Sequence, residues 1–203
     1  TGNTDVESGA GIWMGSGEIG SSWSPIVQGN HIHHNRSGNI GGGITVWDVL
    51  TPEIIDNTIS DNEATNGDGG GIFYRGRLNG GVIRDNIIVN NRAGDKGGGV
   101  LVASLVEYMS IEISGNLIAG NQSDALELTG NSGGGIKLTQ TNAWVHHNTI
   151  VNNTGNGPSD SWGGGIVAYF GGNPIIEQNI IAFSQNGGGI WCDDLTTPTI
   201  RNN

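Results

Sequence analysis

A short glycine-rich string that ends in an aliphatic residue recurs seven times along the chain. The strings occupy residues 9–12, 41–44, 69–72, 97–100, 133–136, 163–166 and 187–190, so the period is about 30 residues. Self-similarity at a period of this kind indicates a solenoid, in which each repeat is one structural unit stacked on its neighbours. The repeat therefore disfavours a compact globule around one central core.

A second element lies between these strings: an aliphatic residue, then Asn three residues later, then Ile two residues after that. It occurs at Val27/Asn30/Ile32, Ile54/Asn57/Ile59, Ile83/Asn86/Ile88, Ile113/Asn116/Ile118, Val145/Asn148/Ile150 and Ile176/Asn179/Ile181, and it stops at Ile200/Asn203. This fixed spacing predicts a rigid corner, with Asn in left-handed backbone and hydrogen-bonded to the equivalent Asn of the next coil. A second file, five residues further on, holds Asn35, Asn62, Asn91, Asn121 and Asn153 and is broken by Ser184.

The repeat predicts an all-β chain of about seven coils with three strands each. The first strand follows the glycine string, and the second and third flank the corner Asn. Alternation assigns the inward side of the first strand to fourteen apolar or aromatic residues, namely Ile12, Met14, Ile44, Val46, Ile72, Tyr74, Val100, Val102, Ile136, Leu138, Ile166, Ala168, Ile190 and Cys192. The 38 glycines fit short strands joined by tight turns.

The Gly-Gly-Gly-Ile, Pro-x-Ile-x-x-Asn and Asn-x-Ile-x-x-Asn strings resemble the repeats of the pectate-lyase-like superfamily. The resemblance covers nearly the whole chain and implies one domain over residues 1–203, a right-handed single-stranded parallel β-helix. That superfamily includes polysaccharide lyases, glycoside hydrolases, epimerases, phage tailspikes, adhesins and non-catalytic surface proteins. The motif therefore specifies architecture more strongly than function.

The resemblance further implies a substrate groove along the outer face of the first strand. Five of the seven coils place an aromatic residue there, and two basic residues accompany them; the predicted carbohydrate-binding residues are Trp13, Trp47, Phe73, Arg75, Lys137, Tyr169 and Trp191. Aromatic faces beside a few polar groups are typical of a site that stacks sugar rings. Two alternatives stay open: a long loop, 15–24 or 122–132, covers the aromatic stripe, or the stripe contacts another protein.

The residues of the predicted groove do not form a complete catalytic set, so the sequence does not decide whether the protein is an enzyme. A lyase needs a base and a group that neutralises the uronate, and an inverting hydrolase needs two carboxylates about 6.5–9.5 Å apart. Arg75 and Lys137 are candidates two coils apart, about 10 Å. Asp193 and Asp194 are similar to the paired aspartates of polygalacturonase-type hydrolases, but the related string at residues 3–5 lies at the opposite end. Arg75, Lys137 and Asp193 are the catalytic candidates of an incomplete set.

Acidic residues in the turns beside the first strand make calcium the one cofactor to consider, with Asp68, Asp95, Asp193 and Asp194 as candidate ligands. No EF-hand or nonapeptide calcium repeat is present, so solvated turn residues are the simpler interpretation. The histidines fall into two groups four coils apart, His31/His33/His34 and His146/His147. Zinc binding by His31 and His33 would need further ligands that the sequence does not show.

The charge balance limits the partners. With 19 acidic and 8 basic residues the formal net charge is −11, which disfavours nucleic acid. No apolar run reaches the roughly 18 residues of a membrane span, and the single Cys192 allows no internal disulfide. The terminal coils have no recognisable cap, so we expect a segment of a longer chain or end-to-end contacts between β-helices.

Two functional hypotheses follow. The first is an extracellular or cell-surface β-helix that recognises or processes a polysaccharide along the outer face of the first strand. The second is a non-catalytic stalk, adhesin segment or fibre subunit whose loops 122–132 and 155–162 form the contact surface. An ice-binding solenoid ranks below both, because no face shows a regular array of Thr.

Overall fold

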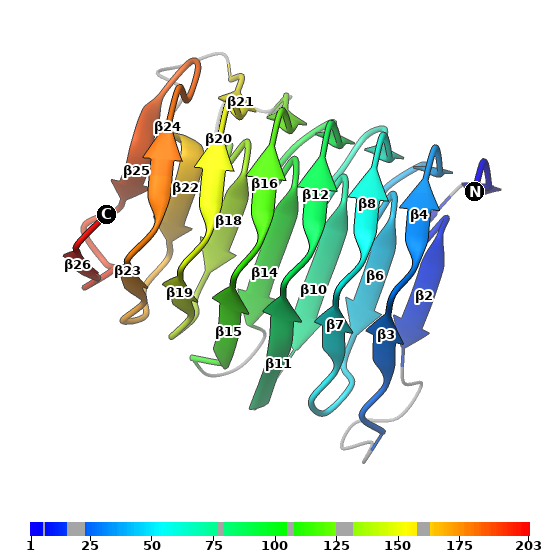
Figure 1. The fold of residues 1–203 in the computed structure, drawn as a ribbon, viewed down its shortest axis with the longest axis horizontal. Coiled ribbons are helices and arrows are strands. Elements are labelled where there is room, and N and C mark those ends of the chain that lie inside the picture. The colour runs from blue at the N-terminus through cyan, green and yellow to red at the C-terminus, as the bar shows by residue number, and fades with distance from the viewer. Residues whose placement is uncertain (6, 16–22, 77–78, 105–107, 125–131, 158–162) are drawn as a thin grey trace.

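The chain is a parallel β-solenoid with four faces (Figure 1). The computed structural model describes residues 1–5, 7–15, 23–76, 79–104, 108–124, 132–157 and 163–203. These ranges contain 26 short strands and no helix, and hence no helix that could cross a membrane.

The strands form two sheets of seven and two of six. The first sheet contains β2 (Ile12–Gly15), β6 (Ile44–Trp47), β10 (Ile72–Gly76), β14 (Val100–Ser104), β18 (Ile136–Thr139), β22 (Gly163–Tyr169) and β25 (Gly188–Cys192). The second contains β3 (Ile26–Gln28), β7 (Glu53–Ile55), β11 (Asn79–Arg84), β15 (Ser110–Ser114), β19 (Trp144–His146), β23 (Ile175–Glu177) and β26 (Thr199–Arg201).

The two smaller sheets lie on either side of the second file of asparagines. The third sheet contains β4 (His31–His33), β8 (Thr58–Ser60), β12 (Ile87–Val89), β16 (Leu117–Ala119), β20 (Thr149–Val151) and β24 (Ile180–Ala182). The fourth contains β1 (Thr4–Asp5), β5 (Arg36–Ser37), β9 (Glu63–Ala64), β13 (Arg92–Ala93), β17 (Gln122–Ser123) and β21 (Thr154–Gly155).

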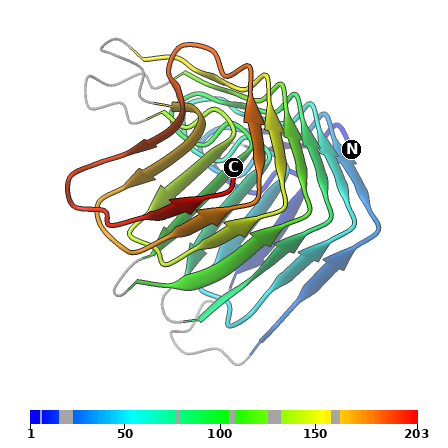
Figure 2. The same ribbon diagram turned by 60° about the vertical axis from the view of Figure 1, so that its left-hand side comes forward.

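The predicted fold class is confirmed, but the predicted three strands per coil are wrong. Five coils, from β2–β5 to β18–β21, contribute one strand to each of the four sheets. The next contributes β22, β23 and β24, and the last contributes β25 and β26. The additional strand has two residues in each coil that contains it, too few to show an alternating pattern in the sequence. Figure 2 shows the coils stacked with nearly the same outline.

The core runs along the inside of the solenoid. Neighbouring strands of the first sheet pair in parallel, so that Ile44, Ile72 and Val100 form one inward file. All fourteen predicted inward residues lie in the apolar core or pack against it, with Ile12, Ile190 and Cys192 partly buried in the terminal coils. Alternation therefore gave the correct inward side of this sheet.

Both asparagine files are hydrogen-bonded ladders. At the first corner, Nδ2 of Asn57 donates to Oδ1 of Asn86 (3.0 Å) and also to the backbone carbonyl of Ile55 (2.9 Å). Equivalent bonds join Asn30 through Asn203. The second ladder begins at Asn3, which the spacing argument did not include, and runs to Asn153.

The left-handed residue at each corner is the one before the ladder Asn, which corrects the prediction. Asp56 and Asp61 have φ of 55° and 54°, whereas Asn57 and Asn62 have no positive φ. The reason is that the ladder Asn must point inward to reach the neighbouring amide and the backbone carbonyls, and Asn57 and Asn62 are accordingly buried. The exposed residue before it makes the bend.

Candidate functional site

The outer face of the first sheet holds two files of side chains. In-register pairing places Trp13, Thr45, Phe73, Leu101, Lys137, Val167 and Trp191 in the outer file that follows the inward Ile or Val. The next outward position forms a file that includes Trp47, Arg75, Ala103, Thr139 and Tyr169. The predicted aromatic residues do not form one exposed row, because the middle of the first file, from Thr45 to Val167, is buried and includes Phe73, whereas Trp13 is 48% exposed.

The turn before each strand covers this buried stretch. Gly69 has φ of +69°, and a Cβ placed on it would lie 2.7 Å from Cβ of Phe73. Gly97, with φ of +68°, stands in the same relation to Leu101, at 2.6 Å. The turn thus folds back over the residue four positions later, which only glycine permits. Of the two loops considered as covers, residues 16–22 and 125–131 lie outside the described residues.

An N-terminal aromatic group, formed by Trp13, Trp47 and Phe73, occupies the first three coils. The Trp13 and Trp47 rings are 6.4 Å apart with 22° between their planes, and the Trp47 and Phe73 rings are 6.1 Å apart with 16°. The guanidinium of Arg75 lies 4.6 Å from the centre of the Trp47 ring, a cation–π contact. A hollow beside Trp13 and Trp47 is also lined by Glu7, Ser8, Asn39 and Ile40.

A C-terminal aromatic group, formed by Tyr169, Phe170 and Trp191, occupies the last two coils. The Tyr169 and Trp191 rings are 6.5 Å apart with 30° between their planes. Phe170 is 54% exposed, and the sequence argument missed it because it lies just past the strand with φ of 64°. The hollow beside this group is also lined by Cys192, Asp193, Asp194 and Leu195.

A buried charged cluster separates the two aromatic groups. Lys137 is 1% exposed, and its Nζ has no hydrogen-bond partner within the described part of the chain. Its Nζ lies 4.5 Å from the centre of the Tyr169 ring. Asp68, Asp95 and Lys96 complete the cluster: Asp95 pairs with Lys96, and Oδ1 of Asp68 accepts the backbone N–H of Lys96 (3.0 Å). A hollow lined by Asp68, Phe73, Arg75 and Lys96 adjoins it.

Burial shifts the two titrating groups of this cluster towards neutrality. Removal from solvent, assisted by the charge of Lys96, lowers the pKa of Lys137 to about 7. Removal from solvent also raises the pKa of Asp68 to about 6, although the charge of Lys96 opposes the change. Lys137 can therefore hold or release a proton near pH 7.

The three catalytic candidates do not converge. Arg75 on β10 reaches Trp47 one coil earlier, whereas Lys137 on β18 reaches Tyr169 one coil later, so the two cations point in opposite directions. Oδ2 of Asp193 accepts the backbone N–H of Phe170 (2.7 Å), and Oδ1 accepts the hydroxyl of Thr196. Asp193 therefore holds a turn closed.

The calcium candidates are likewise dispersed. Asp68 and Asp95 contact Lys96, Asp193 closes the turn, and Asp194 is exposed. No group of three or more His, Cys, Asp or Glu side chains arranged to hold a metal ion occurs in the described ranges.

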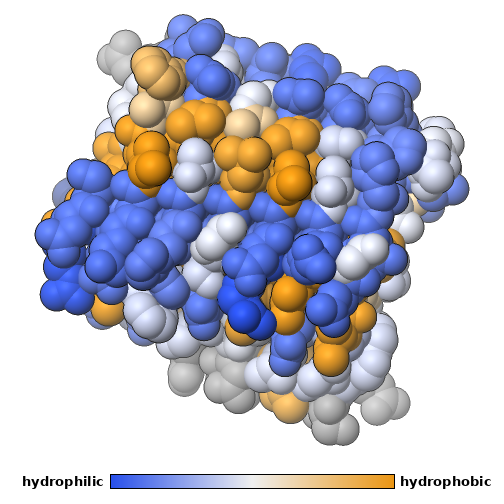
Figure 3. Space-filling view, in the orientation of Figure 1, coloured by the Kyte–Doolittle hydropathy of each residue, from blue (hydrophilic) through white to orange (hydrophobic). Residues whose placement is uncertain are grey.

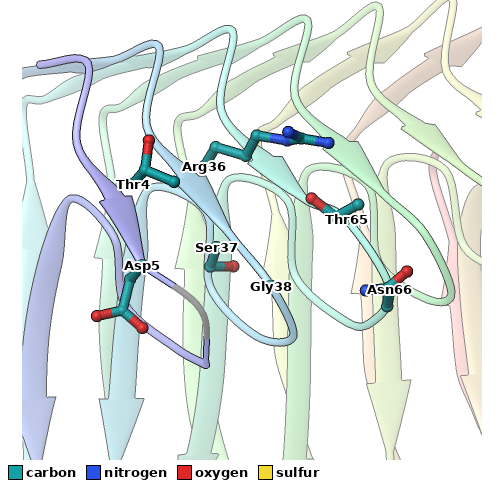
Figure 4. Close-up of a pocket in the computed structure, with 7 residues that line it drawn as sticks. All are labelled: Thr4, Asp5, Arg36, Ser37, Gly38, Thr65 and Asn66. Carbon is teal, nitrogen blue, oxygen red and sulfur yellow. The ribbon is translucent and has the colours of Figure 1, made fainter.

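Another hollow lies on the fourth sheet (Figure 4). Its charged residues already have protein partners: Oδ1 of Asp5 accepts the backbone N–H groups of Glu7 (2.7 Å) and Ser8 (3.0 Å), and Nε of Arg36 donates to Glu63 (3.0 Å). Its remaining lining is Thr4, Ser37, Gly38, Thr65 and Asn66. Both charged side chains of this hollow therefore already take part in contacts within the protein.

The third sheet carries an apolar surface of a different kind, visible in Figure 3. Ile87, Leu117 and Ile180 on its strands are 44%, 38% and 63% exposed. The strands of this sheet contain no charged residue apart from the titratable His31 and His33. Because the exposed side chains on these strands are mainly aliphatic and carry few orienting polar groups, this surface does not resemble a sugar site.

Comparison with known proteins bears on the fold. The sequence profile of one protein family, described as a right-handed β-helix region, matches residues 1–133 and 124–203. No curated protein and no solved structure matches the chain. The predicted superfamily is consistent with the family match.

Proposed function

Because the chain belongs to the family of right-handed β-helix regions, we propose that it binds a polysaccharide along the outer face of the first sheet. The observation that carries the proposal is the presence of an aromatic group at each end of this face, beside a hollow that polar side chains also line. Aromatic faces that stay accessible beside a few polar groups suit sugar rings. The expected location is extracellular or at a cell surface, where such ligands occur.

The spacing of the two groups sets the kind of ligand. Trp47 on β6 and Tyr169 on β22 are four coils apart, about 19 Å at the usual strand spacing. One ligand that touches both groups must therefore be an extended oligosaccharide, and a mono- or disaccharide would occupy one group alone. The polar groups of Asp68 and Lys96 line the hollow between them.

Recognition is better supported than turnover. Lys137 can accept a proton near neutral pH, but the described residues place no second catalytic group opposite it, and Arg75 points away. A lyase or a hydrolase needs at least one such partner.

A glycan array followed by calorimetry tests the proposal. Trp13→Ala and Trp191→Ala each remove one end of the face, and we expect each to weaken binding of an extended oligosaccharide at least tenfold. Trp144→Ala is the matched control, because Trp144 is 44% exposed but lies on the second sheet. Unchanged affinity in both test variants would remove this face from consideration.

A structural role is the second candidate. It is favoured by the first asparagine ladder, which joins Asn30 in the first coil to Asn203 at the last residue without a break. Such continuity suits a stiff stalk or fibre segment. Concentration-dependent filaments in electron micrographs, together with a negative glycan array, would favour this role over the first.

A further inference from the structure

Two pairs of adjacent histidines adopt the same geometry at two different corners. In each pair the first His ends a strand, β19 or β4, and the second has positive φ, 54° at His147 and 56° at His34. The Nδ1 atoms are 2.8 Å apart in His146–His147 and 2.9 Å apart in His33–His34. Both ring pairs are at 85°. His147 lies at the corner between the second and third sheets, and His34 at the corner between the third and fourth. Because the two corners give the same ring arrangement, the local backbone conformation sets it.

This separation suits two ligands of one metal ion. Two imidazole nitrogens that bind a metal at about 2.0–2.1 Å in adjacent square positions are about 2.9 Å apart. Imidazole nitrogen in a square arrangement is favoured by Cu²⁺ and Ni²⁺, and Cu²⁺ binds most tightly of the divalent first-row ions. The same separation also fits one N–H···N hydrogen bond, so a further observation is needed.

The surroundings of His146 supply that observation. Its Nε2 is buried without a hydrogen-bond partner in the described structure, and it lies 3.4 Å from Oε1 of Glu112. That oxygen accepts the hydroxyl of Ser114 (2.7 Å), and the His146 ring stacks on Trp144 at 3.9 Å. Metal-bound histidines characteristically direct the second ring nitrogen to a carboxylate, which fixes the ring and raises its basicity.

The His33–His34 pair has weaker support as a metal site. His31 takes the place of Trp144, with its ring 4.3 Å from that of His33. No ion pair joins His33 to a carboxylate in the part of the chain described.

We propose that the Nδ1 atoms of His146 and His147 bind a divalent transition metal of the Cu²⁺ type, with Glu112 as the outer acceptor for His146. The pair His33–His34 is a second, weaker site of the same kind. No group of three protein ligands exists among the described residues, so solvent completes the coordination of each ion. These sites lie away from the outer face of the first sheet and do not depend on the proposed function.

Titration of untagged protein with CuCl₂ tests the proposal by calorimetry and electron paramagnetic resonance. We expect two ions per chain, with nitrogen hyperfine structure from two imidazoles at the tighter site. His146→Ala combined with His147→Asn removes the tighter site alone, since Asn keeps the left-handed corner, as at Asn90 and Asn152. The proposal would be overturned if the parent protein showed no saturable Cu²⁺ binding, or if this correctly folded variant bound Cu²⁺ as the parent does.

Two further variants separate a metal site from a hydrogen bond. Glu112→Gln should weaken the tighter site roughly tenfold, as loss of an outer acceptor does, whereas Glu53→Gln is the control two coils away on the same sheet. Cu²⁺ should quench Trp144 fluorescence, and Trp144→Phe should abolish that quenching while binding persists. Equal affinities in both Glu variants would contradict the role of Glu112.

Discussion

The two faces of the first sheet follow different rules. The fourteen predicted inward residues of its strands are apolar or aromatic and lie in the core or pack against it, whereas the outward positions pass from an exposed Trp13 through a buried Phe73, Leu101 and Lys137 back to a half-buried Trp191. The repeat dictates the inner face, because each coil must cover the next. The outer face is less uniform: a glycine turn packs against Trp13 as it does against Phe73 and Leu101, yet only the side chains of the middle coils are buried, so neighbours in one file have unlike roles.

The largest effect should come from substituting within the outer file itself. Phe73→Ala should lower the free energy of unfolding by about 3–5 kcal/mol, since a buried aromatic is lost. Trp13→Ala, in the same file but 48% exposed, should cost less than about 1 kcal/mol and act on ligand binding instead. Urea unfolding of the two variants measures both values, and similar losses would abolish the distinction between covered and open positions.

Substitution of Lys137 should stabilise the folded protein, whereas substitution of Phe73 should destabilise it. Lys137→Met removes a buried amine that has no hydrogen-bond partner among the described residues, and we expect unfolding at pH 6 to cost about 1–4 kcal/mol more than in the parent. A variant that is less stable than the parent would show that Lys137 contributes to packing in the folded protein.

The pH dependence follows from the two shifted pKa values. Because the pKa of Lys137 is lowered from 10.5 to about 7, the unfolded chain binds more protons between these values, and stability rises with pH in that window. The pKa of Asp68 is raised from 3.8 to about 6, so its contribution to stability falls as pH rises from 3.8 to 6. Together the two shifts place a minimum in the free energy of unfolding near pH 6–7. Urea unfolding of Lys137→Met should show no rise in this free energy above pH 7.

The asparagine ladders at the corners allow the same comparison between buried and exposed positions for polar side chains. Asn91 is 1% exposed in the middle of the second ladder, and Asn91→Ala should cost about 1–3 kcal/mol because neighbouring amides lose their partner. Asn30 is exposed at the edge of the first ladder, and Asn30→Ala should cost less than half as much. Thermal unfolding compares the two, and equal costs would argue that the ladders act only as spacers.

The smallest effect should come from the outer face of the fourth sheet. Glu63 accepts from both Arg36 (3.0 Å) and Arg92 (3.1 Å) there. Since both arginines are more than half exposed, solvent screens the pairs, and Arg36→Ala should cost about 0.2–1 kcal/mol. The cost should shrink further in 1 M NaCl, and a salt-independent loss would point to packing of the Arg36 stem instead.

The features that could be predicted from the sequence are those that depend on the spacing between repeats. The inward residues and the Asn files follow from period and alternation, and both are confirmed. The burial of Phe73 could not be predicted, since alternation assigns a side chain to a face but not its cover. Phe170 was missed because a left-handed residue after the strand breaks the alternation. The His146–His147 contact depends on corner geometry that the residue types alone do not reveal.

Hydroxyl-radical footprinting read by mass spectrometry tests the central claim most directly, with and without a glycan selected on the array. The account predicts that Trp13 and Trp191 are oxidised readily and protected by the glycan, while Phe73 and Leu101 are oxidised slowly in both states. Rapid oxidation of Phe73, or a bound glycan that protects neither tryptophan, would contradict the division of this face into open ends and a covered middle.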